Sequence, residues 1–353
     1  MRIKLAILDS DVSYLNRIVG VFETRYTDKF QLYSFTNPED AFSIIETAKV
    51  DVLVASDSFE IDVKRLPKRC GFAYFVDSMD IDTFNNQRAI CKFQKSDLIY
   101  KQILSVYSEN ADNISGIKFG DDSTRIIIFQ SVSGGTGASS MAAACAIRFA
   151  AAGKRTLYLN FEKFGFSDNF FTAEGKFDFS DVIFALKSKK TNLSMKLESC
   201  VKQAENGVYF FSSPKIALDM MELTNDDMLR VITELKLTGS YDYIMVDMDF
   251  SLNKEALAVY DKANSIVWVG DGSEISNTKI MRALNALVTL EHNMDSIITD
   301  RVALIYNKFS NKTSKALTDI GLKFIGGAPR FEHATTEQIL EQLSSKDMFD
   351  KLI

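Results

Sequence analysis

The sequence has little of the two residue types that build disulfide frameworks and zinc sites. Among 353 residues there are only four cysteines and two histidines. The cysteines (Cys70, Cys91, Cys145 and Cys200) are scattered along the chain with no paired spacing. We therefore expect neither a disulfide framework nor a zinc site, which fits a protein of the reducing cytoplasm.

Long apolar runs and an excess of positive charge are also missing. No stretch approaches the roughly 20 apolar residues that cross a bilayer, and Met1 leads directly into a strand-like run, so no secretory signal is expected. The formal net charge is −6, whereas nucleic-acid binding usually requires a basic face. The lysines between Lys187 and Lys202 are expected on a solvated surface. We expect no membrane insertion and no specific nucleic-acid partner.

Apolar strand-like runs alternate with helical patterns in two series, and a chain of this length is expected to form two domains. The first series comprises residues 3–8, 30–35, 50–55, 72–76 and 89–93; the second starts at Arg125 with the run 126–129 and continues with residues 156–159, 208–211, 243–246, 265–269, 302–306 and 323–325. Such alternation predicts the α/β class with doubly wound parallel sheets. We place one domain at residues 1–108, a polar linker at 109–123 and a second domain at 124–353.

Polar residues follow the strands of the first domain, where parallel sheets bind their ligands. Asp9 and Asp11 follow the first run, Ser56 and Asp57 the third, and Lys95 the fifth. This pattern resembles a response-regulator receiver domain, which has a flavodoxin-like fold. Ser56 stands at the expected phosphoacceptor position, and Asp57 is offset by one residue, which turns a side chain the other way. The resemblance implies an atypical, non-phosphorylated receiver used for docking; the alternative is an unrelated five-stranded α/β domain.

The second domain opens on a glycine-rich turn between an apolar strand and an alanine-rich segment. Gly134, Gly135 and Gly137 form the turn, and its backbone N–H groups at a helix N-terminus could hold an anion. Ser139 and Ser140 stand where a phosphate-binding loop places its magnesium-ligating hydroxyl. The alternative for this segment alone is a glycine turn without a ligand.

The loop resembles that of the deviant Walker-type ATPases of the ParA/MinD superfamily, which have the pattern Lys-Gly-Gly-x-Gly-Lys-Ser/Thr-Ser/Thr. The corresponding residues here are Ser133, Gly134, Gly135, Thr136, Gly137, Ala138, Ser139 and Ser140. Both lysines are missing. Ser133 replaces the signature lysine that reaches the partner subunit's nucleotide, and Ala138 replaces the lysine within the loop.

Other features of that superfamily follow in order. The resemblance implies that Glu162 would orient an attacking water and that Asp247, with Ser139, would serve Mg²⁺, Asp247 through a water molecule. It also implies that Asn307, next to Lys308, reads the adenine edge. The segment with Pro329 and Arg330 would pack on the base. We therefore expect ATP and Mg²⁺ as cofactors.

A receiver-like domain followed by a degenerate ParA/MinD-type domain is the plan of the TadZ/CpaE family of pilus-assembly proteins. The segment from 211–214 through 224–227 and on to 241–243 is also similar to that family. The resemblance implies a cytoplasmic homodimer, often at a cell pole, whose partners are components of Tad-type pilus or secretion machinery.

The two missing lysines bear on whether the protein hydrolyses ATP or only binds it. Losing a charged phosphate donor costs about 1.5–3 kcal/mol, or one to two decades in affinity, and phosphoryl transfer depends on such charges. We favour an ATP-binding, nucleotide-gated dimer with weak or no hydrolysis. Three alternatives stay open: an active ATPase rescued by Lys163 or Arg330, a membrane-cycling MinD-like protein, and a scaffold without nucleotide. The acidic residues from Glu337 to Asp350 argue against a basic membrane helix.

Overall fold

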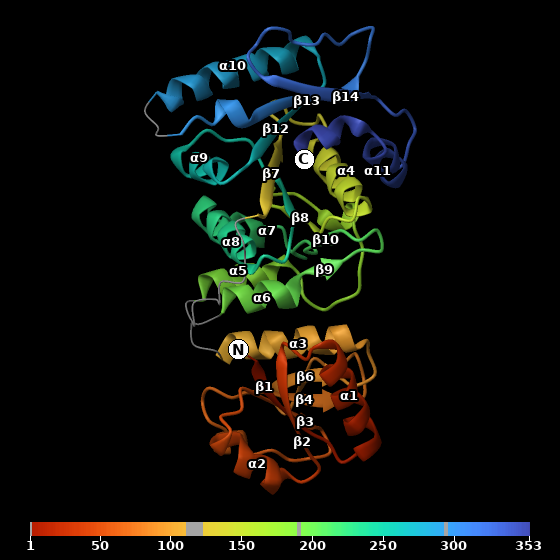
Figure 1. Ribbon diagram of the computed structural model, residues 1–353, viewed down its shortest axis with the longest axis vertical. Helices are drawn as coiled ribbons and strands as arrows, with labels where there is room; N and C mark the ends of the chain where they lie inside the picture. The colour runs from red at the N-terminus through yellow and green to blue at the C-terminus, as the bar shows by residue number, and fades with distance from the viewer. Residues whose placement is uncertain (1, 111–122, 189–191, 293–295) are drawn as a thin grey trace. The chain divides into compact units, whose positions relative to one another are not determined.

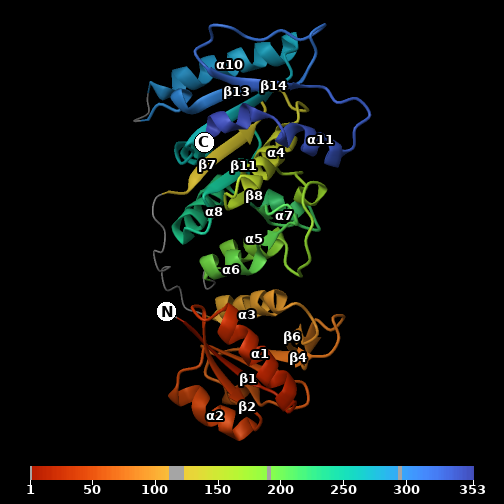
Figure 2. The same ribbon diagram turned by 45° about the vertical axis from the view of Figure 1, so that its right-hand side comes forward.

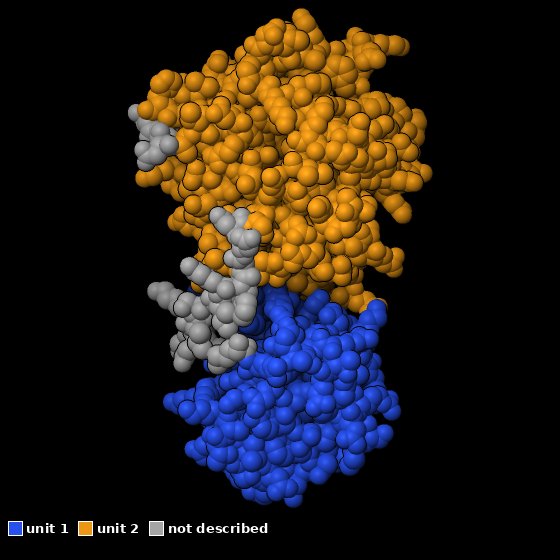
Figure 3. Space-filling model, in the orientation of Figure 1, with its two compact units in different colours: residues 1–116, 184–200 blue, residues 117–183, 201–353 orange. Residues whose placement is uncertain are grey.

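The computed structural model describes residues 2–110, 123–188, 192–292 and 296–353 (Figures 1 and 2). The chain divides into two compact units, one of residues 1–116 with 184–200 and the other of residues 117–183 with 201–353 (Figure 3). Most of the predicted linker, 109–123, lies outside the described residues. The sequence did not lead us to place residues 184–200 with the N-terminal unit.

The N-terminal unit contains a six-stranded sheet with the order β2-β1-β3-β4-β6-β5. Its strands are β1 (Ile3–Leu8), β2 (Phe30–Phe35), β3 (Val52–Ser56), β4 (Gly71–Val76), β5 (Thr83–Phe84) and β6 (Gln87–Cys91). All neighbours are parallel except β5 and β6. The five predicted strands are confirmed in number and order, and β5 is an addition.

Helices cover both faces of this sheet. The core on one face is formed with α1 (Val12–Arg25) and α3 (Ser96–Asn110), and the core on the other with α2 (Pro38–Thr47). A short 3₁₀ helix, η1 (Val63–Arg65), follows β3. Asp11 caps α1 by accepting from two backbone N–H groups of its first turn, a role typical of Asp at this position. Its carboxylate is therefore engaged in the local turn.

The connection from β4 to β6 contains no helix, although parallel neighbours are usually joined by one. Residues 83–88 instead form a hairpin of β5 with β6. Asn85 and Asn86 at its tip have φ values of 48° and 57°, the left-handed conformation that a two-residue type I′ turn requires. The hairpin thus takes the place of the last crossover helix of a doubly wound sheet.

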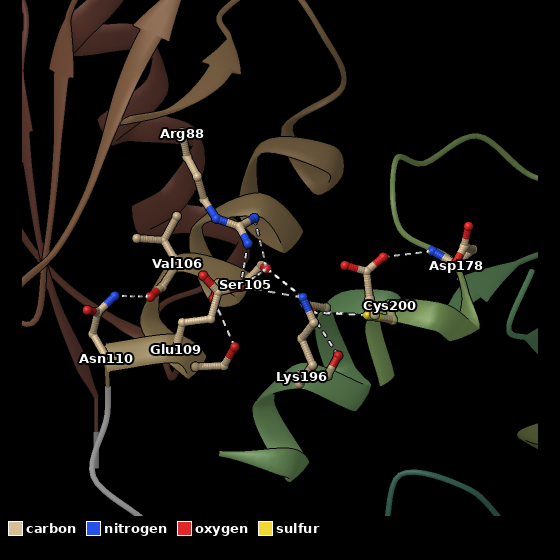
Figure 4. Close-up of polar contacts among 11 residues, drawn as sticks. Arg88, Ser105, Val106, Glu109, Asn110, Asp178, Lys196 and Cys200 are labelled. Carbon is tan, nitrogen blue, oxygen red and sulfur yellow. Dashed lines mark hydrogen bonds and ion pairs between the residues drawn. The ribbon is translucent and has the colours of Figure 1, made fainter. Parts of the chain in front are cut away.

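A helix from far along the chain completes the N-terminal unit. In α6 (Leu193–Cys200), the Lys196 side chain is only 2% exposed. Its Nζ donates to Ser105 Oγ at 2.9 Å and lies 3.7 Å from Glu109 Oε1 (Figure 4). Glu109 also pairs with Arg88. The prediction of a solvated lysine surface is therefore wrong at Lys196, and also at Lys202, which is buried and donates through Nζ to Ser212 Oγ at 2.8 Å.

A second polar cluster and apolar packing hold α6 on the same unit. Glu198 Oε1 accepts from Lys29 Nζ at 2.8 Å and from the Tyr100 hydroxyl at 2.7 Å. Met195 packs against the core that α1 and α3 share. The backbone N–H of Asn192 donates to the carbonyl of Ser108 at 3.0 Å. These contacts explain why residues 184–200 belong with the N-terminal unit.

The second unit contains an eight-stranded sheet with the order β14-β13-β12-β7-β11-β8-β10-β9. Its strands are β7 (Arg125–Gln130), β8 (Thr156–Asn160), β9 (Lys202–Gln203), β10 (Tyr209–Phe210), β11 (Tyr243–Asp247), β12 (Ser265–Gly270), β13 (Val302–Phe309) and β14 (Lys323–Pro329). All pairs are parallel except β9 with β10. All seven predicted strands are present.

The remaining helices belong to the chain from residue 138 onward. They are α4 (Ala138–Ala151), α5 (Phe179–Lys187), α7 (Leu218–Met221), α8 (Asn225–Thr238), α9 (Lys254–Asp261), α10 (Glu274–Glu291) and α11 (Thr336–Ser344), with 3₁₀ helices η2 (Ser167–Asn169), η3 (Thr299–Arg301) and η4 (Asp347–Leu352). In the part of the chain that the structure describes, none of the helices is long and apolar enough to span a membrane.

The core of the second unit places α4 against the middle of the sheet. The alanine-rich face of α4 packs with residues of β7, β11 and β12 and with α11 on the same side. The small side chains let the helix approach the sheet closely. Because β7 lies between β12 and β11, the chain leaves it near the switch point where such sheets bind ligands.

Candidate functional site

The glycine loop joins the end of β7 to the start of α4. Gly134, Gly135 and Gly137 have φ values of 67°, 68° and 87°, a region that other residues adopt only at a cost. Gly137 is the residue directly before α4, so the unpaired backbone N–H groups of the first helical turn follow it. A Cβ on Gly137 would lie 2.5 Å from Asn307 Nδ2. Loop and helix start therefore have the form of an anion-binding site.

Hydroxyl groups fix the base of the loop. The buried Thr136 hydroxyl donates to the carbonyl of Val269 at 2.9 Å, which ties the loop to β12. Ser133 Oγ lies 3.0 Å from Ser276 Oγ of α10. Ser133 stands where the resemblance expects the signature lysine, and its short side chain contacts the same chain instead.

Two carboxyl groups meet beside the loop. Ser139 Oγ, in the first turn of α4, donates to Glu162 Oε2 at 2.9 Å. Asp247, the last residue of β11, is fully buried, and its Oδ2 accepts from the Tyr158 hydroxyl at 2.7 Å. Among the described residues no hydrogen bond of 3.5 Å or less reaches Asp247 Oδ1, although the Ser139 hydroxyl is close enough to lower the pKa of Asp247. A buried oxygen without a partner is rare in folded proteins and calls for an explanation such as a bound ion.

Burial alters the protonation of this pair. It raises the pKa of Asp247 to about 8, and the neighbouring charge of Glu162 adds to the effect. Burial also raises the pKa of Glu162, which the hydrogen bond from Ser139 opposes. Two close carboxylates out of water resist being ionised together. A divalent cation would relieve that repulsion.

The oxygen atoms here fit Mg²⁺ only as part of a larger ligand set. Hydroxyl and carboxylate oxygens are the hard ligands that Mg²⁺ prefers, completed by waters and phosphate oxygens. No group of three or more His, Cys, Asp or Glu that could hold a metal occurs within residues 2–110, 123–188, 192–292 and 296–353. Ser139 and Asp247 would therefore need nucleotide and water oxygens to complete a magnesium site.

The end of β13 contacts the glycine loop directly. The buried side chain of Asn307 donates through Nδ2 to the carbonyl of Thr136 at 2.8 Å. Lys308 Nζ donates to the carbonyl of Gly135, also at 2.8 Å. The sequence pointed to these residues as readers of adenine and did not suggest contacts with the loop backbone. Reading of the base by Asn307 stays a prediction.

The other predicted residues lie on nearby connections. Ser140 is half-buried in the first turn of α4, and Ala138 is buried beside it. Pro329 ends β14, and the exposed Arg330 side chain lies 3.9 Å from Glu332 Oε1. Lys163 is exposed. No hydrogen bond or ion pair between the side chain of Lys163 or Arg330 and the glycine loop occurs in the described parts of the chain.

The strand ends of the N-terminal sheet hold a smaller polar group. Lys92 Nζ lies 2.8 Å from Asp9 Oδ2 and 3.2 Å from Ser56 Oγ, and all three side chains are largely buried. The lysine of the receiver-like site is therefore Lys92, the first residue after β6, and the prediction of Lys95 is wrong. Lys95 instead directly precedes α3. Ser56 ends β3 at the phosphoacceptor position, as predicted.

Comparison with known proteins gives a family for the first domain. Residues 1–108 match the family model described as TadZ-like, receiver domain. None of the curated proteins compared with the chain matches it in sequence.

Solved structures resemble the larger part of the chain. A ParA family ATPase from Chlorobium tepidum is 22% identical with a TM-score of 0.49, covering 64% of this chain and 95% of its own. The septum site-determining protein MinD of Pyrococcus horikoshii, solved with Mg-ADP, is 18% identical with a TM-score of 0.49, covering 65% and 97%. A chain of the MinC:MinD cell division protein complex of Aquifex aeolicus is 16% identical with a TM-score of 0.48, covering 65% of this chain and 95% of its own.

The family match and the described geometry agree with the domain order inferred from sequence. The strand–glycine loop–helix unit of β7 and α4 opens an α/β domain that follows the matched region. Residues 1–108 therefore match the receiver domain of the TadZ-like family, and a second α/β domain that opens on a glycine loop follows them.

Proposed function

We propose that the protein is an ATP-binding, nucleotide-gated dimeric localisation or assembly factor for Tad-type pilus or secretion machinery, with weak or no ATP hydrolysis. The observation that carries the nucleotide part is the buried Asp247 Oδ1, which accepts no hydrogen bond of 3.5 Å or less from the described residues and lies near Ser139 and Glu162 beside the glycine loop. The TadZ-like receiver domain supports the link to pilus or secretion machinery.

Each part of the site has a role in this proposal. The backbone N–H groups of residues 134–140 would bind phosphates. Ser139 would hold Mg²⁺ directly and Asp247 through a water molecule, and the ion would neutralise phosphate charge. Glu162 would orient a water for any residual hydrolysis. Asn307, with the segment of Pro329 and Arg330, would contact the base.

The loop supports binding better than turnover. Residues 133–140 contain neither lysine nor arginine, and a missing charged donor weakens phosphate binding by about 1.5–3 kcal/mol. The backbone cradle and Mg²⁺ remain as binding groups. Catalysis suffers more, because phosphoryl transfer depends on charge stabilisation in the transition state.

Apolar side chains beside the site support dimer formation. Phe164 and Phe166 follow Glu162 on the loop after β8, and their side chains are 79% and 49% exposed. Exposed aromatic groups at a ligand site are typical anchors of protein interfaces. We propose that nucleotide binding orders this loop and that a second copy of the chain covers it. The receiver domain would then dock components of the pilus or secretion machinery.

Calorimetry of Mg-ATP binding tests the nucleotide assignment. Wild-type protein should bind, and Asp247→Asn should lose most of the magnesium-dependent part of the affinity while binding in EDTA stays the same. Glu255→Gln, which neutralises an exposed carboxylate on α9 of the same unit, should behave like wild type. Absence of binding by the wild-type protein would favour the nucleotide-free scaffold, and unchanged binding by Asp247→Asn would refute the metal assignment.

A further inference from the structure

Strand β13 is distorted where it reaches the glycine loop. Its pairing with β14 shifts register between Tyr306 and Phe309, so Asn307 and Lys308 lie in a bulge. Lys308 has a φ of 55°, which is uncommon for a residue with a side chain. Bulges re-aim side chains and are frequent next to active sites. Strained residues persist only where their surroundings hold them, often at functional sites.

The bulge directs both side chains onto one short stretch of backbone. Asn307 Nδ2 donates to the carbonyl of Thr136, and Lys308 Nζ to that of Gly135. Lys308 Cε also lies 3.7 Å from the position of a Cβ on Gly137. The aliphatic part of Lys308 thus runs along the loop, and its ammonium group lies at the loop's backbone.

The two contacts differ in how firmly they hold. Asn307 is buried, whereas Lys308 is exposed. A lysine carries its charge on a flexible four-carbon stem. Hydrogen bonds of a cation to a phosphate are stronger than those to a neutral carbonyl. A phosphate in the loop would therefore compete well for the ammonium group.

We propose that Lys308 supplies the positive charge missing at Ser133 and Ala138, moving from the carbonyl of Gly135 to a phosphate of the bound nucleotide. The inference rests on the proposed nucleotide binding. It makes Lys308 a phosphate-binding residue that arrives from β13, outside the loop, and it replaces the sequence-based candidates Lys163 and Arg330. It also separates the two residues of the bulge: Asn307 shapes the loop, and Lys308 recognises its ligand.

The number of phosphates on the ligand distinguishes this role from base reading. Affinities of wild-type, Lys308→Met and Lys308→Arg proteins for ATP, ADP and AMP, each with Mg²⁺, would be measured by calorimetry or by competition. We expect Lys308→Met to weaken ATP binding about 10- to 100-fold, ADP binding less, and AMP binding little. Lys308→Arg should keep most of the affinity. Lys312→Met, which removes an exposed lysine four residues later, is the matched control for net charge.

Two further measurements complete the test. Thermal unfolding without ligand should show that Lys308→Met is as stable as wild type to within a few degrees. Adding Ala138→Lys to the Lys308→Met variant should restore its ATP affinity. Equal losses for ATP, ADP and AMP, or no loss for ATP, would overturn the inference while leaving nucleotide binding intact. Wild-type protein that binds none of the three nucleotides would instead refute the proposed function on which it rests.

Discussion

The side-chain amide of Asn307 donates a 2.8 Å hydrogen bond to the carbonyl of Thr136, 171 residues away along the chain. Both residues are buried, so the bond is shielded from water and an unpaired partner would be costly. It fixes the glycine loop against the end of β13 and leaves no space at Gly137 for a side chain. The shape of the loop thus depends on β13, a strand that lies far along the sequence from the loop.

Gly137→Val should abolish nucleotide binding. Its Cβ would meet Asn307 Nδ2 at 2.5 Å, and a β-branched residue at a φ of 87° is strained. The loop would have to move, which removes the backbone cradle. Calorimetry with Mg-ATP should show no measurable binding.

Gly153→Ala is the matched control for that variant. Gly153 also has a positive φ, 77°, but an added Cβ there meets nothing within 4 Å. It should therefore cost about 1 kcal/mol of stability and leave the ATP affinity unchanged. Wild-type affinity in Gly137→Val would refute the assignment of the loop.

Ala138→Lys should strengthen ATP binding by about one to two decades, because it adds a charged donor where the loop has none. Hydrolysis by wild-type protein should be slow or undetectable. The measurements are calorimetry and release of inorganic phosphate at saturating ATP. Wild-type turnover as fast as that of lysine-bearing relatives would contradict the account of a switch with weak hydrolysis.

The sequence was sufficient to predict which strand ends meet at the site. Glu162 follows β8, and Asp247 ends β11, the parallel neighbour of β8. The carboxyl ends of such strands share one edge of the sheet. Errors in strand length did matter. The apolar run that ends at Phe93 gave Lys95 as the receiver lysine, but β6 ends at Cys91 and the next residue, Lys92, occupies the site.

Other features depend on tertiary contacts that no local pattern encodes. The bulge that turns Asn307 and Lys308 toward the loop lies at the end of an apolar strand whose pairing with β14 also shifts register between Leu304 and Ile305. From the sequence, Lys196 is expected on the surface, because a lysine is rarely buried without partners. Its partners, Ser105 and Glu109, come from a helix about 90 residues earlier. Burial of this kind follows only from knowing which helices pack together.

Asp242 should make the second unit sensitive to acid. Its carboxylate accepts from the Arg155 guanidinium at 2.7 Å and from the Arg155 backbone N–H at 2.8 Å, and these bonds hold the pKa of Asp242 below its ordinary value. A lowered folded-state pKa gives stability that is present above the unfolded pKa and is lost as pH falls through the folded one. Urea unfolding from about pH 6 down to pH 2 should show this loss, and Asp242→Asn should reduce it.

Arg155→Gln is the companion variant for Asp242. It removes the guanidinium partner and should flatten part of the acid dependence, because the backbone N–H of residue 155 still donates to Asp242. Because the two residues form one interaction, the double variant should add little to either single change. Equal acid sensitivity in wild type and Asp242→Asn would show that this pair is not the source.

Lys196→Met should destabilise the N-terminal unit by about 1–3 kcal/mol, since it removes a buried charge with hydrogen-bonded partners. Glu109 keeps Arg88 as a partner, which limits the loss. Lys29→Met removes the more exposed ion pair with Glu198 on the same helix and should cost less than about 1 kcal/mol. Denaturant unfolding measures both, and equal effects would contradict the burial argument.

The central claim is that ATP gates a dimer held mainly by apolar and polar surface, since Ser133 cannot reach a partner's phosphates with a charge. Phe164→Ser should weaken such a dimer. Ile297→Ser, which alters an exposed apolar residue before the amino end of β13, should not.

Sedimentation velocity with and without Mg-ATP, at low and high salt, tests this claim most directly. The account predicts a dimer that requires ATP and persists in high salt, because few charge pairs would cross the interface near the phosphates. A monomer under every condition, a dimer indifferent to ATP, or a dimer that dissociates in moderate salt would contradict it.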